Sequence, residues 1–382
     1  MKPHIPYGRQ DISLDDVKAV TDVLQSDWIT QGETGPRFEC HLAAYCGANH
    51  AVAVNSATSA LHIACLALGL KSGDILWTTP ITFVASANVG LYCGASVDFV
   101  DIDERTFNLC PIKLKDKLEQ ACKEGSLPKV LVVVHLAGQP CEMEAIFALK
   151  EQYGFHIIED ASHALGATLE REKVGSCSYS DIAVFSFHPV KMITTAEGGA
   201  ALTQDADLAD KMRLYRSHGV TREEHLMETH PAPGGWYYEQ VTLGYNYRMT
   251  DVHAALGVSQ IERLASGIAA RHVLFDRYAT LLGNLPVTLP WQHPDTYSAL
   301  HLYPIQVEDR ARIFAGMRAA GVLVNVHYIP VHLQPNYRRM GFNPGDFPVS
   351  EAYYERALSI PLWAAMTEAQ QDHVVDTLKS LL

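Results

Sequence analysis

The sequence predicts an α/β protein with a mostly parallel central sheet and a smaller C-terminal α/β domain. Short β-rich runs alternate with helical stretches through about residue 205. One of these runs, LVVVHL (131–136), is apolar on both faces, as expected of a strand that helices cover on both sides. After about residue 250 long helical patterns replace the alternation. We therefore expect a large domain over 1–255, including an N-terminal arm, and a small domain over 256–382.

The expected elements follow in chain order. Helical patterns run from 252 to the proline-rich stretch 284–294, and two further strands are expected at 303–307 and 322–331 with a helix between them. In the first 205 residues the expected strands are 50–55, 74–79, 96–102, 129–136, 155–160, 181–187 and 199–204.

Composition narrows the class of protein. With 48% hydrophobic and 19% charged residues, the 382-residue chain is typical of a globular protein with about two domains. Its net charge of −13 argues against general binding to nucleic acid or to anionic membranes. The N-terminus has no apolar signal segment, and the eight cysteines form no C-x-x-C pair. We expect a cytoplasmic protein without a metal, since the paired histidines are five residues apart and do not share a helical face.

An anion site is indicated where the strand that ends at Asn55 meets an apolar helix. Ser56 through Ser59 are small and mostly hydroxyl-bearing, and the N–H groups of a helix N-terminus attract anions. The alternative is an ordinary helix N-cap.

The second candidate is the carboxyl end of the strand 155–160, where open α/β sheets bind ligands. Asp160 there could bind a metal, act as a base, or pair with a protonated ring nitrogen, and His163 follows three residues later. The alternative is a capping aspartate beside a structural histidine.

The third candidate is Lys191, in a loop rich in glycine and threonine between two apolar strands. A partly desolvated lysine has a lowered pKa and can attack an aldehyde. The alternative is a lysine that extends from the loop into solvent. Together, an anion cradle, a strand-end aspartate and a loop lysine match what pyridoxal phosphate requires.

Motifs spread over nearly the whole chain resemble one family. NSATSALHIA (55–64), TPITFVASANV (79–89), EDASHALG (159–166), SFHPVK (186–191) with a following EGG, and GYNYRMTD (244–251) occur in the order seen in the DegT/DnrJ/EryC1/StrS sugar aminotransferases. The chain ends are most similar to the pseudaminic-acid branch of that family. The resemblance implies the fold-type-I architecture of pyridoxal-phosphate enzymes and a homodimer whose active sites lie at the subunit interface.

The resemblance also implies roles for individual residues. Lys191 and Asp160 would serve catalysis and hold the cofactor, and His163 would lie beside it. Asn246 would reach the phosphate site of the neighbouring subunit. The cofactor phosphate would be held by Ala57, Thr58 and Ser186, its ring would stack on Phe83, and the substrate would contact Tyr7, Arg248, His327 and Tyr328.

The activity implied by the resemblance is transfer of an amino group, from L-glutamate, to C4 of a UDP-4-keto-6-deoxy-N-acetyl-L-hexosamine. The alternatives are a sister enzyme that aminates another nucleotide-linked 3- or 4-keto sugar, and a regulator that binds the cofactor without turnover. Three positions depart from the branch: Glu33, Met192 and Ala196. Ala196 stands where glycine is usual, so it must tolerate a positive φ if the glycine served that purpose.

Overall fold

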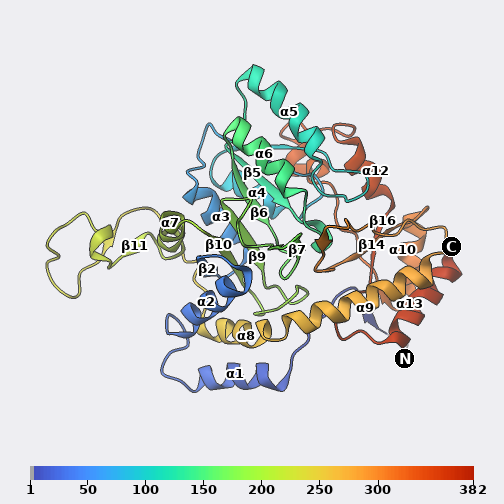
Figure 1. Cartoon of the computed structure of the whole chain (residues 1–382), viewed down its shortest axis with the longest axis horizontal. Coiled ribbons are helices and arrows are strands. Elements are labelled where there is room, and N and C mark those ends of the chain that lie inside the picture. The colour runs from blue at the N-terminus through green and yellow to red at the C-terminus, as the bar shows by residue number, and fades with distance from the viewer. Residues whose placement is uncertain (1–3) are drawn as a thin grey trace.

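The computed structural model describes residues 4–382 and is built around a seven-stranded sheet (Figure 1). The strands run in one direction except β10, which is antiparallel to both of its neighbours, β2 and β9. All seven strands expected in the first 205 residues are present, which confirms the mostly parallel sheet. In sheet order they are β2 (His50–Val54), β10 (Gly199–Thr203), β9 (Ile182–Ser186), β6 (His156–Asp160), β5 (Val130–Val134), β3 (Ile75–Thr78) and β4 (Ser96–Phe99).

Helices bury both faces of this sheet. Val52 and Val54 of β2 and Val130 and Val132 of β5 face one helical layer, and the residues between them face the other, so both faces present apolar side chains. One layer is α3 (Ala57–Ala67), α4 (Ala85–Tyr92) and α7 (Ala206–Arg216). The other is α2 (Thr34–Cys46), α5 (Pro111–Glu124), α6 (Met143–Tyr153) and α8 (Asp251–Ile261).

The C-terminal part has a separate apolar core. The long helix α9 (Leu264–Leu282) continues from α8 into it, beside the C-terminus in Figure 1. Near the N-terminus, β1 (Ile5–Pro6) pairs with β15 (Val322–Leu323), so this arm lies on the C-terminal part. The other elements there are β14 (Tyr303–Gln306), α10 (Arg310–Ala319), η3 (Val331–Leu333), α11 (Pro335–Arg338), α12 (Pro348–Arg356), β16 (Ala357–Ile360) and α13 (Glu368–Leu381).

The expected division at residue 255 falls inside α8 and stays a prediction. Shorter elements complete the fold, and β11 and β12 pair at the base of a loop that projects from the body in Figure 1. These elements are α1 (Leu14–Leu24), η1 (Leu136–Gly138), β7 (Thr168–Leu169), β8 (Glu172–Lys173), β11 (Val220–Thr221), η2 (Glu224–Leu226), β12 (Glu239–Gln240) and β13 (Thr296–Tyr297). No helix within residues 4–382 has the length and apolarity needed to span a membrane.

The expected strand over 322–331 is wrong for most of its length. Only β15 is a strand, and the chain then turns away from regular pairing. The Asn325 side chain accepts the N–H of Val326 at 2.9 Å, which replaces a ladder hydrogen bond with a local one. Asn325 still forms an isolated bridge with Ser359 of β16, and His327 Nδ1 lies 2.9 Å from the Ser359 hydroxyl. The apolar pattern of this segment thus reflects burial along an irregular path.

Candidate active site

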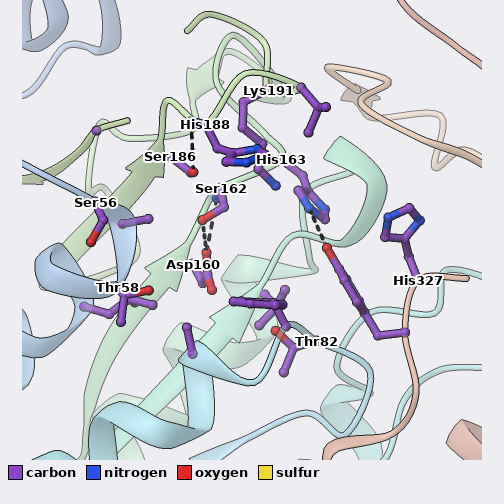
Figure 2. A pocket seen from close by; sticks show the side chains of 18 of the residues that line it. Ser56, Thr58, Thr82, Asp160, Ser162, His163, Ser186, His188, Lys191 and His327 are labelled. Atoms are coloured by element: carbon purple, nitrogen blue, oxygen red, sulfur yellow. Dashed lines mark hydrogen bonds between the residues drawn. The ribbon is translucent and has the colours of Figure 1, made fainter. Parts of the chain in front are cut away.

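A cavity of about 520 Å³ opens at the carboxyl ends of β5, β6 and β9, the edge where parallel sheets bind ligands (Figure 2). It brings together segments from the whole chain, including the N-terminal arm and the irregular segment after β15. Of the residues expected at the site, ten line it: Tyr7, Ala57, Thr58, Phe83, Asp160, His163, Ser186, Lys191, His327 and Tyr328.

The first turn of α3 forms one wall of the cavity. Ser56 is the N-cap residue, and its hydroxyl accepts the N–H of Ser59 at 3.1 Å. Ala57 and Thr58 hold the first two helical positions, whose N–H groups have no acceptor within the helix. Gly199 passes so close that a Cβ there would collide with the backbone of Ser56 and Ala57. This wall is therefore an N–H-lined cradle that suits a phosphate group.

Asp160, at the end of β6, is held by two serines. The carboxylate is only 6% exposed; its Oδ2 accepts the Ser86 hydroxyl at 2.7 Å and its Oδ1 accepts the Ser162 hydroxyl at 2.6 Å. Thr82 Oγ1 lies 2.7 Å from the Ser86 hydroxyl and extends the network. Two donors on different oxygens fix the plane of the carboxylate, so its direction into the cavity is set by the fold.

Sequence reasoning missed these supporting residues. A signal for Ser162 existed, since a serine two residues after an aspartate is typical of a turn closed by the aspartate side chain. Thr82 and Ser86 are four residues apart, but nothing local indicates that Ser86 meets Asp160. Glu197, the first residue of the EGG motif, and Asn325 also line the cavity, although neither was expected as a site residue.

Lys191 lies in the loop after β9, and its backbone N–H donates to the His188 carbonyl at 2.9 Å. Burial lowers the pKa of the Lys191 amine to about 8, while the nearby charge of Asp160 opposes this shift. A larger share of the amine is therefore neutral at physiological pH than in an ordinary lysine. A neutral amine that faces the cavity is a nucleophile for an aldehyde.

The loop that joins Lys191 to β10 contains Ala196 with φ of +66°, the region that favours glycine. Ala196 therefore adopts the positive φ that was expected if the usual glycine served that purpose. Thr194 stabilises the turn, since its hydroxyl accepts the Ala196 N–H at 3.0 Å. Of the other two departures, Met192 packs against the apolar core around α2 and α8, and Glu33 stands at the N-cap position of α2 without a side-chain hydrogen bond to the helix.

His163 is buried beside Lys191 and bonds at both ring nitrogens (Figure 2). Its Nδ1 accepts the N–H of Ala137 at 3.3 Å, and its Nε2 lies 3.1 Å from the Tyr328 hydroxyl. Burial, and to a smaller extent the positive charge of Lys191, hold the pKa of His163 well below its usual value. The imidazole is therefore neutral at physiological pH.

Four aromatic rings, those of Tyr7, Phe83, His327 and Tyr328, line another part of the cavity. The ring of Tyr7 lies 5.2 Å from that of His327, whose Nδ1 is 2.9 Å from the Ser359 hydroxyl. Burial, followed by the charge of Lys191, lowers the pKa of His327 to about 3. Phe83 is 60% exposed, with its ring 6.4 Å from that of Tyr328. An exposed phenylalanine at a cavity mouth offers a face for a flat ligand.

Asn246 and Arg248 do not line the cavity of their own chain. They belong to a segment that lies along the end of β2: Arg248 forms a bridge with Val54, and the Asn246 carbonyl accepts the Asn55 amide at 3.5 Å. Asn246 itself is exposed. Their expected roles toward cofactor and substrate stay predictions.

Positively charged side chains are scarce in the lining of the cavity. Among the lining residues that the structure describes, Lys191 is the single lysine and there is no arginine. Within residues 4–382 no three side chains of histidine, cysteine, aspartate or glutamate are grouped as metal ligands would be. The chemistry that the cavity offers is therefore that of an amine, two carboxylates, imidazoles and hydroxyl groups.

Known proteins are similar to this chain over nearly its whole length. Residues 10–379 match the DegT/DnrJ/EryC1/StrS aminotransferase family. The chain is 37% identical to a Campylobacter jejuni UDP-4-amino-4,6-dideoxy-N-acetyl-beta-L-altrosamine transaminase, over 99% of this chain and 97% of that protein. It is 36% identical, with the same coverage, to the Bacillus subtilis spore coat polysaccharide biosynthesis protein SpsC. The solved structure of Helicobacter pylori PseC, an aminotransferase of pseudaminic acid biosynthesis, superposes with a TM-score of 0.90 at 30% identity, covering 99% of both chains.

Proposed function

The chain belongs to the DegT/DnrJ/EryC1/StrS aminotransferase family, and on that premise we propose that it aminates C4 of a UDP-linked 4-keto-6-deoxy-N-acetyl-L-hexosamine. It is a sugar aminotransferase that depends on pyridoxal phosphate, as its family is. The pathway we propose is pseudaminic acid biosynthesis, and the amino donor is L-glutamate. The proposed substrate rests on the similarity of this chain, over nearly its full length, to the Campylobacter transaminase and to the Helicobacter aminotransferase.

The cavity fits pyridoxal phosphate. Ala57 and Thr58 offer free N–H groups, with Ser186 opposite them, and the close approach of Gly199 leaves this cradle lined by backbone rather than by side chains. We propose that these residues hold the phosphate. The carboxylate of Asp160 would hold the proton on the ring nitrogen, and Lys191 would bind the aldehyde carbon.

The reaction exchanges an amino group and a carbonyl oxygen: glutamate becomes 2-oxoglutarate, and the keto sugar becomes the amino sugar. When bound, pyridoxal phosphate withdraws electrons from the carbon that loses its proton. We assign the proton transfer to Lys191, whose Nζ accepts the proton from Cα of glutamate in the first half and delivers one to C4 of the sugar in the second. A pKa near 8 suits both directions, since the amine can hold or release a proton near neutral pH.

We further propose a cytoplasmic homodimer with shared active sites. Glutamate carries two carboxylates and a UDP-sugar a diphosphate, whereas the described lining residues include no arginine and only one lysine, Lys191, which is assigned to the aldehyde. Arg248 could supply a further cation to the site of a second copy, and Asn246 could contact that copy's phosphate. Exposed apolar side chains such as Trp28, Trp236 and Leu243 give a surface that a second copy would cover.

An absorbance experiment tests the proposal. Purified protein is loaded with pyridoxal phosphate, and the visible band of the bound cofactor is followed as L-glutamate and then the UDP-4-keto sugar are added. Loss of the band with glutamate and its return with the keto sugar, together with an amino sugar found by mass spectrometry, is the expected result. A band that forms but does not respond to glutamate would contradict the amino donor and favour a regulator.

A sister activity is the second candidate, because the spore coat protein SpsC is nearly as similar to this chain as the Campylobacter transaminase is. A panel of nucleotide-linked 3- and 4-keto sugars separates the two. A kcat/KM highest for the UDP-linked N-acetylated L-sugar supports the proposal, and a higher value for another sugar would replace it with the sister activity.

A further inference from the structure

The hydrogen bond between His163 and Tyr328 has a defined direction. His163 Nδ1 accepts the Ala137 N–H at 3.3 Å, so this nitrogen carries no proton. A neutral imidazole has one N–H, which must then be on Nε2. Since Nε2 lies 3.1 Å from the Tyr328 oxygen, the histidine donates and the tyrosine accepts.

The surroundings keep this arrangement fixed. The His163 ring is buried and packs against the ring of His301 at 4.4 Å, and its low pKa keeps it from gaining a second proton. The Ala137 N–H comes from the turn that follows β5, so the histidine is anchored to the central sheet. Tyr328 is thereby tied to the sheet although it comes from the irregular segment beyond β15.

The hydroxyl hydrogen of Tyr328 is left available. Its oxygen is used as an acceptor by His163, and within residues 4–382 the hydroxyl has no second hydrogen-bond partner. Burial raises the pKa of Tyr328, so the phenol keeps its proton. Because Tyr328 lines the cavity beside Lys191 and Asp160, this hydrogen can be donated to a ligand there.

We propose that His163 is a positioning residue that makes the Tyr328 hydroxyl a hydrogen-bond donor to an oxygen of the ligand in the cavity. The ligand chemistry is an oxygen acceptor, which either the phenolic oxygen of pyridoxal phosphate or the carbonyl oxygen of the keto sugar can provide. The sugar alternative rests on the function proposed above, and the cofactor alternative does not.

A double-mutant cycle tests this dependence. Y328F removes the hydroxyl and keeps the ring, H163L removes both hydrogen bonds of the histidine, and H163Q keeps an amide that can still donate to Tyr328. Y337F is the matched control, because Tyr337 donates its hydroxyl to Asn88 at 2.7 Å and does not line the cavity. Thermal unfolding of each cofactor-free variant identifies any that fail to fold.

Two measurements separate the possible acceptors. The dissociation constant of pyridoxal phosphate, from an absorbance titration, reports on the cofactor oxygen, and kcat/KM for the UDP-4-keto sugar reports on the sugar oxygen. If the acceptor is on the cofactor, we expect Y328F and H163L each to weaken binding of pyridoxal phosphate about 10-fold; if it is on the sugar, each should lower kcat/KM about 10-fold. The double variant should show the same loss of about 10-fold rather than about 100-fold, and H163Q should stay within about 3-fold of wild type. Y337F should leave both unchanged.

Several results would overturn the inference: additive losses in the cycle, a loss in H163Q as large as in H163L, or no effect of Y328F on either quantity. If H163L fails to fold, the losses measured for Y328F and H163Q still test whether His163 positions the Tyr328 hydroxyl. Failure of the proposed function has a different appearance, namely wild-type protein that binds pyridoxal phosphate but does not convert the keto sugar. The titration of the cofactor alone then decides the inference.

Discussion

The floor of the cavity and its rim are built in different ways. The floor (Thr82, Ser86, Asp160, Ser162 and Lys191) stands on or beside regular elements, and its carboxylate is buried and doubly hydrogen-bonded. The rim (Tyr7, Phe83, Glu197, His327 and Tyr328) comes from loops and the N-terminal arm, and Phe83 is 60% exposed. The difference indicates that the fold of one chain fixes the position of the carboxylate, whereas the side chains of the rim depend on the path of loops and of the N-terminal arm.

Replacing Lys191 should have the largest effect. We expect K191A to lose turnover by at least about 10³-fold, because no other amine lines the described cavity and both binding of the aldehyde and proton transfer depend on it. Pyridoxal phosphate should still bind, held by the phosphate cradle. Steady-state assays with K211A, which removes an exposed lysine of α7, provide the control. Wild-type turnover in K191A would refute the assignment of this lysine.

Changes to Asp160 or to its serine partner should have the second-largest effect, on the rate of the glutamate half-reaction. We expect D160N to slow the glutamate half-reaction by about 10²-fold, since an amide cannot balance a protonated ring nitrogen. S86A, which removes one of the two serine donors, should slow it by about 10-fold. Stopped-flow absorbance after addition of glutamate measures both. D210N, at an exposed ion pair with Arg213, should not change the rate, and an equal loss there would point to a general effect on stability.

The pH dependence of cofactor loading sharpens the same comparison. Because the pKa of Lys191 is lowered to about 8, its neutral, reactive fraction rises about 50-fold between pH 6 and pH 8 and then levels off. The rate at which pyridoxal phosphate binds to Lys191 should follow that curve once the titration of the free cofactor is subtracted. A rate that continues to climb past pH 9 would indicate an ordinary lysine and a more solvated floor.

A mixed-dimer experiment tests whether the rim is shared. The double variant N246A/R248A should raise KM for the UDP-sugar by about 10-fold or more, since it removes a cation and an amide expected at the other copy's site. Refolding or co-expressing it with K191A at equal amounts should give about a quarter of wild-type activity, because half of the dimers are mixed and each has one intact site. Activity no greater than the sum of the two parents would show that each chain completes its own rim.

The smallest effect concerns the loop between floor and sheet. Ala196 has φ of +66°, so A196G should stabilise the protein by about 0.5–1 kcal/mol, seen as a rise in Tm of about 1–3 °C. A269G, in the exposed middle of α9, should instead destabilise by about 1 kcal/mol, as glycine does within a helix. A lower Tm for A196G would mean that the rigidity of alanine outweighs its strain here.

Sequence reasoning succeeded where the signal is local. Each expected strand of the central sheet is a short β-rich run, and β5 is apolar throughout because helices cover both of its faces. Asp160 ends one such strand and Lys191 lies in the loop that follows another, and the carboxyl ends of parallel strands meet at one edge. The local pattern alone therefore predicts that both residues lie in one cavity, as they do.

The same reasoning failed where apolar residues are buried without regular pairing. The run 322–331 has the composition of a strand, but Asn325 bonds to its own neighbour and the chain leaves the sheet after β15. An alternating or apolar pattern reports burial, and it does not distinguish a ladder from an irregular path that is equally buried. The departure brings His327 and Tyr328 to the cavity.

The α/β class, the strands of the sheet, and the aspartate and lysine at its edge can be predicted from the sequence, because they depend on residues adjacent in the chain. The hydrogen bonds of Ser86 with Asp160, 74 positions away, and of Tyr328 with His163, 165 positions away, are set by the three-dimensional fold. Such contacts depend on strand order and on how the C-terminal part packs against the sheet. The free energy of that packing comes from many apolar residues, including those of the clusters around α3 and around α9. No local sequence pattern at Ser86 or Tyr328 therefore identifies its partner.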